Sequence, residues 1–209
     1  MKSPFTYKHT VPKELGDKKP ALFLLHGMGS NEEDLPQLVE DFKDTHHIFS
    51  LRGPIVFNPG YAFFTIEEEG KPERHIFDQV LVYVQSFIRE AITEFKLNPK
   101  EISVVGFSQG AVLAQALGII MGIEIKAVAS LSGYLPDFVK EQYRKVPIEH
   151  LKVFISHGDY DYVIPPKRAI DSKEYFESAG AEVTFKTYGE GHGVVPENQA
   201  DLVTFLKSY

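Results

Sequence analysis

The residues with the clearest capacity for chemistry form a short glycine-flanked turn, Gly106-Phe107-Ser108-Gln109-Gly110. This G-x-S-x-G pattern follows a β-branched apolar run and precedes an Ala- and Leu-rich run, so it joins a predicted strand to a predicted helix. A nucleophilic serine must stand clear of the backbone so that a base and a substrate carbonyl can both reach it. Glycines two positions before and after the serine relieve the crowding of so sharp a turn. The pattern predicts a nucleophile at Ser108; the alternative is an ordinary N-cap serine.

A serine nucleophile needs a general base, which is most often histidine. Of the eight histidines, three follow predicted strands: His26, His157 and His192. His192 lies among glycines in the segment 189–193, between the last predicted strand and the last predicted helix. A loop with few side chains lets an imidazole reach the end of another strand. We therefore predict His192 as the base, and His26 and His157 as buried histidines that hydrogen-bond to nearby loops.

The base in turn needs a carboxylate to orient it, and two candidates, Asp159 and Asp161, follow the apolar run at 151–156. Asp161 is preferred, because Asp159 directly follows a glycine and suits a turn that satisfies local N–H groups. The chain order Ser108, Asp161, His192 is then the order of an α/β-hydrolase triad. A metal site at His157, Asp159, Asp161 and His192 is disfavoured, because these residues lack the i, i+4 helical spacing of metal ligands.

A tetrahedral intermediate also needs an oxyanion hole. One donor is the N–H of Gln109, the residue after the serine, and the second is expected from the loop after the first predicted strand. That loop has the sequence His26-Gly27-Met28-Gly29. Its glycines carry no side chains and let the backbone lie close to the site, so the Met28 N–H is the predicted second donor.

These residues are positioned by a chain that alternates short apolar runs with amphipathic segments. The alternation predicts a mostly parallel sheet with helices on both faces, in which ligands bind at the carboxyl ends of the strands. Ser30 and Glu33 predict a capping box at the first helix. The predicted strands are 21–27, 47–54, 101–107, 125–133, 151–159 and 182–189; the predicted helices are 30–43, 72–95, 108–121, 137–144, 165–180 and 196–208.

The composition limits the classes of partner. The 209 residues suit one domain, 1–209, and are 43% hydrophobic and 24% charged, with a formal net charge of −7. Lys and Arg do not cluster, which argues against nucleic acid as a partner. Cysteine is absent, which excludes thiolate chemistry and disulfides. No secretory signal or apolar span is evident, so we expect a cytoplasmic protein with no integral membrane association. The sequence leaves a homodimer open.

Several short motifs in order resemble the phospholipase/carboxylesterase family of α/β-hydrolases, which includes acyl-protein thioesterases and small bacterial carboxylesterases. The resemblance covers nearly the whole chain. It implies an α/β-hydrolase fold with no large cap domain, the roles given above to the five site residues, and no metal or other cofactor. The motifs are residues 25–29, 106–110, 131–136, 157–159 with Asp161 and 163–165, and 191–192.

The chain departs from the family pattern at two places. Ala111 stands where many members have a second glycine after the serine turn, and the chain lacks the Trp-Phe pair that often follows the fourth strand. Residues 58–70 stand in its place, and we expect specificity to lie there. Tyr61, Phe63 and Phe64 are the candidates for lining the substrate pocket; the alternative is that their rings pack beneath the loop.

The sequence therefore predicts a serine carboxylesterase for small to medium acyl esters, working through an acyl-enzyme. Activity should rise with pH as the histidine base loses its proton. A thioesterase, a lysophospholipase or an amidase on the same site remains open, as does a catalytically silent module that binds acyl ligands.

Overall fold

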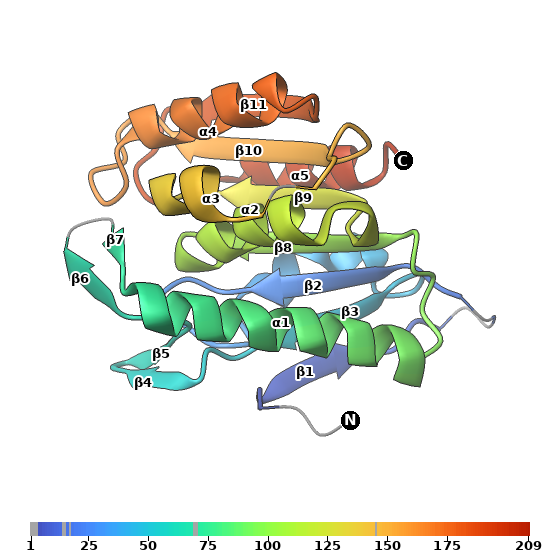
Figure 1. Cartoon of the computed structure of the whole chain (residues 1–209). Coiled ribbons are helices and arrows are strands. Elements are labelled where there is room, and N and C mark those ends of the chain that lie inside the picture. The colour runs from blue at the N-terminus through green and yellow to red at the C-terminus, as the bar shows by residue number, and fades with distance from the viewer. Residues whose placement is uncertain (1–3, 14–15, 17, 69–70, 145) are drawn as a thin grey trace.

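The computed structural model describes residues 4–13, 16, 18–68, 71–144 and 146–209. These residues form a seven-stranded sheet with the order β1-β3-β2-β8-β9-β10-β11, in which β1 is antiparallel to β3 and the other neighbours are parallel (Figure 1). The mostly parallel sheet predicted from the sequence is thereby confirmed. The strands are β1 (Tyr7–Thr10), β2 (Ala21–Leu25), β3 (His47–Leu51), β8 (Ile102–Phe107), β9 (Ala127–Leu131), β10 (Lys152–Gly158) and β11 (Glu182–Tyr188).

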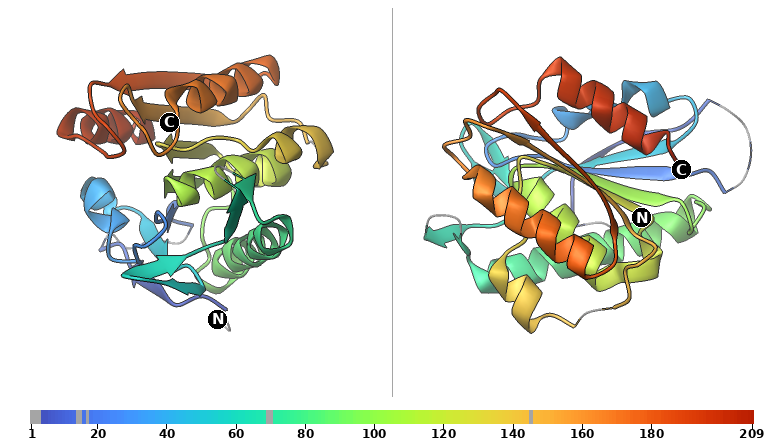
Figure 2. Two further views of the ribbon diagram at one scale, coloured as in Figure 1. Left: turned by 90° about the vertical axis from the view of Figure 1, so that its left-hand side faces the viewer. Right: turned by 90° about the horizontal axis from the view of Figure 1, so that it is seen from above.

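Helices cover both faces of the sheet (Figure 2). On one face lie α1 (Arg74–Glu94), α2 (Gln109–Met121), α3 (Asp137–Gln142) and α4 (Pro166–Ser178); on the other lie the 3₁₀ helix η1 (Leu35–Phe42) and α5 (Pro196–Leu206). A further 3₁₀ turn, η2 (Gly122–Glu124), follows α2.

The side chains of each central strand alternate between two hydrophobic cores, as the period of two in a strand requires. In β2, Phe23 and Leu25 face the core under α1 and α2, whereas Leu22 and Leu24 face the core under η1 and α5. Strands that are buried on both faces read as continuous apolar runs, which is why the sequence pattern located them correctly.

The strand order reverses between β2 and β8. The chain runs from β2 to β3 toward one edge, and α1 then carries it back to β8, from which β9, β10 and β11 follow toward the other edge. Ligand sites of open α/β sheets lie at such a switch point, outside the carboxyl ends of the strands. The loop after β2 and the turn after β8 meet there.

The expected helix at 30–43 is wrong in length and type. The structure has only the 3₁₀ helix η1, with Pro36 in its first turn and a break in helical geometry at Val39. The capping box is absent, because Ser30 Oγ donates to Asp34 Oδ2 at 2.7 Å and the Glu33 carboxylate pairs with Lys8. The apolar side chains of Leu35, Val39 and Phe42 are still buried against the sheet.

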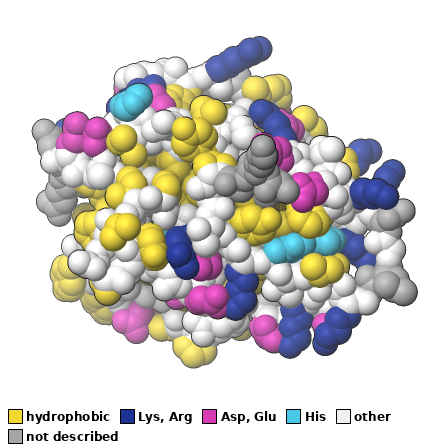
Figure 3. Space-filling view, turned by 90° about the horizontal axis from the view of Figure 1, so that it is seen from below, with side chains coloured by type: hydrophobic (Ala, Val, Ile, Leu, Met, Phe, Trp, Pro, Cys, Tyr) yellow, Lys and Arg dark blue, Asp and Glu magenta, His cyan; other side chains and the backbone are white. Residues whose placement is uncertain are grey.

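Within the described residues, six elements have no counterpart in the sequence prediction. They are the edge strand β1, the 3₁₀ turn η2 and the four strands of two small hairpins, β4 (Ile55–Phe57) with β5 (Gly60–Ala62), and β6 (Ile66–Glu68) with β7 (Lys71–Pro72). The hairpins lie at the carboxyl end of the sheet (Figure 1). Figure 3 shows the molecule from below the view of Figure 1, with hydrophobic side chains gathered toward that end. Lys, Arg, Asp and Glu side chains are interspersed over the rest of the face in this view.

Candidate active site

The turn between β8 and α2 holds Ser108 in a backbone conformation that few non-glycine residues adopt, with φ of 51° and ψ of −115°. The neighbouring glycines make this turn sterically possible. A Cβ at Gly106 would lie 2.2 Å from the Gly110 carbonyl oxygen, and a Cβ at Gly110 would lie 1.9 Å from the Leu25 carbonyl oxygen. The G-x-S-x-G pattern thus lets strand and helix meet with the serine side chain presented at the top of the turn.

Ser108, His192 and Asp161 form a continuous chain of hydrogen bonds. His192 Nε2 lies 2.8 Å from Ser108 Oγ, and His192 Nδ1 lies 2.7 Å from Asp161 Oδ2. Because an ionised carboxylate only accepts, Nδ1 carries the proton and Nε2 is free to accept from the serine hydroxyl. The structure therefore brings together the three residues that the sequence predicted as nucleophile, base and acid.

Further donors hold the Asp161 side chain, which is buried. Its Oδ1 accepts the N–H groups of Val163 and Ile164, both at 2.8 Å. His157 Nε2 donates to the Ile164 carbonyl oxygen at 2.8 Å and lies 3.2 Å from Asp161 Oδ2. His157 thus ties down the loop that carries Asp161, as expected of a buried histidine at this position.

Asp159, the rejected candidate for the acid, is exposed in the turn after β10. Its backbone N–H donates to the Tyr188 carbonyl oxygen at 2.8 Å, which joins this turn to the end of β11. No group of three or more metal-ligating side chains converges within the described ranges.

Met28 and Gln109, the predicted oxyanion donors, line the same pocket as Ser108. Within the part of the chain that the structure describes, neither backbone N–H group has a hydrogen-bond acceptor. The Gln109 N–H is at the N-terminus of α2, where the helix dipole favours negative charge.

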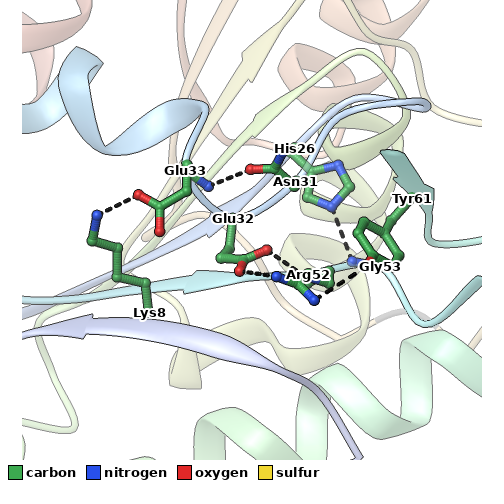
Figure 4. A network of polar contacts seen from close by, with 8 residues as sticks. All are labelled: Lys8, His26, Asn31, Glu32, Glu33, Arg52, Gly53 and Tyr61. Carbon is green, nitrogen blue, oxygen red and sulfur yellow. Dashed lines mark hydrogen bonds and ion pairs between the residues drawn. The ribbon is translucent and has the colours of Figure 1, made fainter. Parts of the chain in front are cut away.

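A network behind the Met28 loop holds it in place (Figure 4). His26 Nδ1 donates to the Gly27 carbonyl oxygen at 2.7 Å, and His26 Nε2 accepts the Gly53 N–H at 2.9 Å. Arg52 forms a bidentate ion pair with Glu32, in which Arg52 Nε lies 2.6 Å from Glu32 Oε2 and Nη2 contacts Oε1. The loop after β2 is therefore anchored to the segment after β3.

The β5 strand supports the other side of this loop. The Gly29 N–H donates to the Tyr61 carbonyl oxygen and the Tyr61 N–H donates to the Ser30 carbonyl oxygen, both at 2.8 Å. The Arg52 guanidinium lies over the Tyr61 ring, 4.5 Å from its centroid. Sequence reasoning missed this support, because short strands and backbone pairing leave little local pattern.

The side chain of Gln109 has a role that its sequence position did not indicate. Its Oε1 accepts the Phe63 N–H at 2.6 Å, and its Nε2 donates to the Phe64 carbonyl oxygen at 2.7 Å. Both bonds are buried. They fasten residues 63–64 to the first turn of α2, directly after Ser108.

An apolar pocket of about 120 Å³ opens beside Ser108. Its apolar surface suits the hydrocarbon part of an acyl group. The pocket is lined by Met28, Phe64, Ile66, Ser108, Gln109, Val112, Tyr134, Val163 and Ile164.

Of the three aromatic residues expected to line the pocket, only Phe64 does. Phe63 is fully buried and packs against His26, with ring centroids 4.8 Å apart. Tyr61 contacts Arg52, as described above. The expectation is therefore wrong for Tyr61 and Phe63, because the Tyr61 ring packs against Arg52 and the Phe63 ring packs against His26. Residues 69–70 of the expected specificity segment lie outside the described residues.

Comparisons with known proteins agree with this architecture. A family model described as phospholipase/carboxylesterase matches residues 8–209. The acyl-protein thioesterase 1 of Candida albicans is 29% identical over 222 residues, which cover 95% of this chain and 95% of that protein.

None of the helices in the described segments has the length and hydropathy of a membrane span.

Solved structures show the same fold. The carboxylesterase of Bacillus cereus superposes with a TM-score of 0.88 at 25% identity, over 97% of this chain and 93% of that one. A carboxylesterase from Mesorhizobium loti gives a TM-score of 0.85 at 21% identity, over 100% and 97% of the two chains. The α/β-hydrolase fold without a large cap domain, expected from the sequence, is confirmed.

Proposed function

The chain belongs to the phospholipase/carboxylesterase family of α/β-hydrolases, and from that premise we propose that it hydrolyses small to medium acyl esters through Ser108, His192 and Asp161. Membership of this family makes it a carboxylic ester hydrolase of the serine type. The observation that carries the proposal for these residues is the hydrogen-bonded chain from Ser108 Oγ through His192 to Asp161.

In the first half-reaction, Ser108 Oγ attacks the ester carbonyl carbon while His192 Nε2 takes the hydroxyl proton. Asp161 accepts the hydrogen bond of His192 Nδ1–H and stabilises the imidazolium that forms. The Met28 and Gln109 N–H groups stabilise the oxyanion, and each such donor is typically worth a rate factor of about 10²–10³. His192 then returns the proton to the leaving alcohol, and the acyl group stays on Ser108.

In the second half-reaction, His192 takes a proton from water, which attacks the acyl-enzyme carbonyl. Collapse of the second tetrahedral intermediate releases the carboxylic acid, and the proton returns to Ser108. During both steps the hydrocarbon of the acyl group occupies the apolar pocket that Phe64 and Val112 help to line.

A thioesterase is the second candidate, because a relative that aligns over 95% of this chain carries the name acyl-protein thioesterase 1. The same nucleophile, base and oxyanion donors would act on a thioester carbonyl. Oxygen esters and thioesters of one acyl group, compared by kcat/KM, separate the two substrate classes.

The experiment that tests the proposal is hydrolysis of p-nitrophenyl esters from acetate to palmitate by the wild type and by Ser108→Ala. We expect turnover by the wild type, with the highest kcat/KM at small to medium acyl lengths, and loss of at least about 10³ in kcat for the variant. A fluorophosphonate probe should label the wild type only.

Equal turnover by wild type and variant would contradict the role of Ser108. A folded wild-type protein that binds acyl ligands, with no turnover of any ester and no labelling by the probe, would instead indicate a catalytically silent module.

A further inference from the structure

A second hollow, of about 210 Å³, lies beside the candidate active site and is separate from the acyl pocket. Four apolar side chains and two polar ones form its walls, and neither Ser108 nor His192 is among them. It is lined by Asp34, Leu35, Gln37, Leu38, Phe107 and Val194.

This hollow borders the site from the His192 side. Phe107 directly precedes Ser108, and its ring centroid lies 5.1 Å from that of His192. Val194 follows His192 by two residues. The acyl pocket instead lies on the side of Met28 and Gln109. The two hollows thus lie on two sides of Ser108, and an ester bound there has two halves to place: its acyl chain and its alcohol.

The direction of proton transfer indicates which half of the ester lies in which hollow. His192 Nε2 delivers its proton to the leaving oxygen as the bond between that oxygen and the carbonyl carbon breaks, so the alcohol departs on the His192 side. The acyl chain, which remains on Ser108, occupies the other side.

The charge in the hollow comes from Asp34. Its Oδ2 accepts the Ser30 hydroxyl at 2.7 Å, and the described residues provide no ion pair for its carboxylate. The neighbouring acidic residues Glu32 and Glu33 are paired, with Arg52 and Lys8. An unpaired carboxylate beside apolar walls suits a ligand with an apolar body and a positive charge.

We propose that this hollow is the leaving-group subsite and that Asp34 favours alcohols that carry an ammonium group. The inference rests on the proposed function, since it names the alcohol half of the substrate for the same reaction. Leu35, Leu38 and Phe107 contact the carbon body of the alcohol, and Asp34 attracts its charge.

The test uses three butyrate esters, so that the acyl group is constant and only the alcohol changes. Butyrylcholine carries a cation, 3,3-dimethylbutyl butyrate is its neutral isostere, and the butyrate ester of 2-hydroxyethanesulfonate carries an anion. For the wild type at low ionic strength, kcat/KM should be highest for the cation and lowest for the anion.

Asp34→Asn should lower the ratio of kcat/KM for the cationic ester to that for its neutral isostere by about three- to fivefold, the range of a partly exposed charge pair. The asparagine Oδ1 can still accept the Ser30 hydroxyl. Added salt should lower the wild-type ratio in the same direction. The matched control is Asp159→Asn, which removes an exposed carboxylate close to Asp161 but outside the hollow and should leave the ratio unchanged.

A second variant tests the walls. Leu38→Trp should narrow the hollow and lower kcat/KM about tenfold more for both bulky butyrates than for methyl butyrate. The inference is overturned if all three esters are hydrolysed with a charge-independent kcat/KM, or if Asp34→Asn and Asp159→Asn change the ratio equally. Failure to hydrolyse any ester, without labelling of Ser108 by a fluorophosphonate, would overturn the proposed function itself.

Discussion

At the scale of the residue, His26 shows how a buried histidine serves a site that it does not enter. Its Nδ1 donates to the Gly27 carbonyl oxygen and its Nε2 accepts the Gly53 N–H, so its tautomer is determined by its partners. Burial lowers the pKa of His26, which keeps the ring neutral and able to accept. A protonated ring would present two donors, and the bond from Gly53 would be lost. The neutral ring therefore holds the loop that presents Met28.

Replacing His26 by Gln should lower kcat about tenfold and change KM little. The physical reason is displacement of the Met28 N–H, whose contribution is largest in the transition state. Steady-state kinetics on a p-nitrophenyl ester measures both parameters, with circular dichroism as a check on folding. The matched control is His75→Gln, the same chemical change at an exposed position on α1. A rise in KM at unchanged kcat would contradict a positioning role in the oxyanion hole.

At the scale of the element, the close approach of α2 to β2 determines where Ser108 lies. The helix begins directly after the serine, and Gly110 in its first turn packs against the backbone at the end of β2. The same turn of α2 holds residues 63–64 through the Gln109 side chain. One short helical turn thus connects the nucleophile, the oxyanion loop and one wall of the acyl pocket.

Gly110→Ala should therefore lower the free energy of unfolding by about 2–3 kcal/mol and abolish most activity. The added Cβ would lie 1.9 Å from the Leu25 carbonyl oxygen, and the helix and strand must separate to accommodate it. For a protein of this length the expected loss of Tm is about 4–12 °C, measured by thermal unfolding. Gly189→Ala is the control, because its Cβ would have no neighbour within 4 Å. Equal effects of the two substitutions would show that the close approach is unimportant.

At the scale of the whole molecule, two hydrophobic cores pack on opposite faces of the sheet whose strands carry the loops of the site. The sheet edge at β1 adds aromatic packing to one of these cores. His9 of β1 stacks on Phe49 with ring centroids 4.1 Å apart, and it also contacts Phe95 after α1. Its Nε2 lies 2.9 Å from His47 Nδ1 on β3. Burial, and then the charge of His47, lower the pKa of His9 to about 4.

This pKa makes the stability of the molecule depend on pH. The unfolded chain binds a proton at His9 below its ordinary pKa of about 6.5, whereas the folded protein does so only near pH 4. The free energy of unfolding should therefore fall as the pH drops from 6.5 toward 4. His9→Gln should make the slope of the free energy of unfolding against pH shallower. The change in slope should be less than about 1.4 kcal/mol per pH unit, which is the limit for the binding of one proton.

Urea unfolding at pH 7.5, 6.5, 5.5 and 5.0 measures this slope. The exposed His150, replaced by Gln, is the control and should leave the slope unchanged. If His9→Gln had the same slope as the wild type, protonation of His9 would not be coupled to folding.

The sequence by itself determined the parallel strands of the sheet, most of its helices and the residues of the candidate site. Parallel strands buried on both faces are short apolar runs, and α1 has a long apolar stripe, so both are visible locally. The carboxyl ends of parallel strands lie at one edge of the sheet, and the chain positions of Ser108, Asp161 and His192 after three strands therefore placed them together in advance. Their catalytic roles, and those of Met28 and Gln109, stay predictions.

Only the tertiary structure decided which loop residues face the site. Tyr61, Phe63 and Phe64 are neighbours with similar side chains, yet only Phe64 lines the acyl pocket, because the other two rings pack against side chains of other segments. The strand β1 and the hollow at Asp34 likewise depend on contacts between segments far apart in the chain. Local patterns report the burial and period of an element, whereas the direction of a loop side chain is set by partners that no local pattern contains.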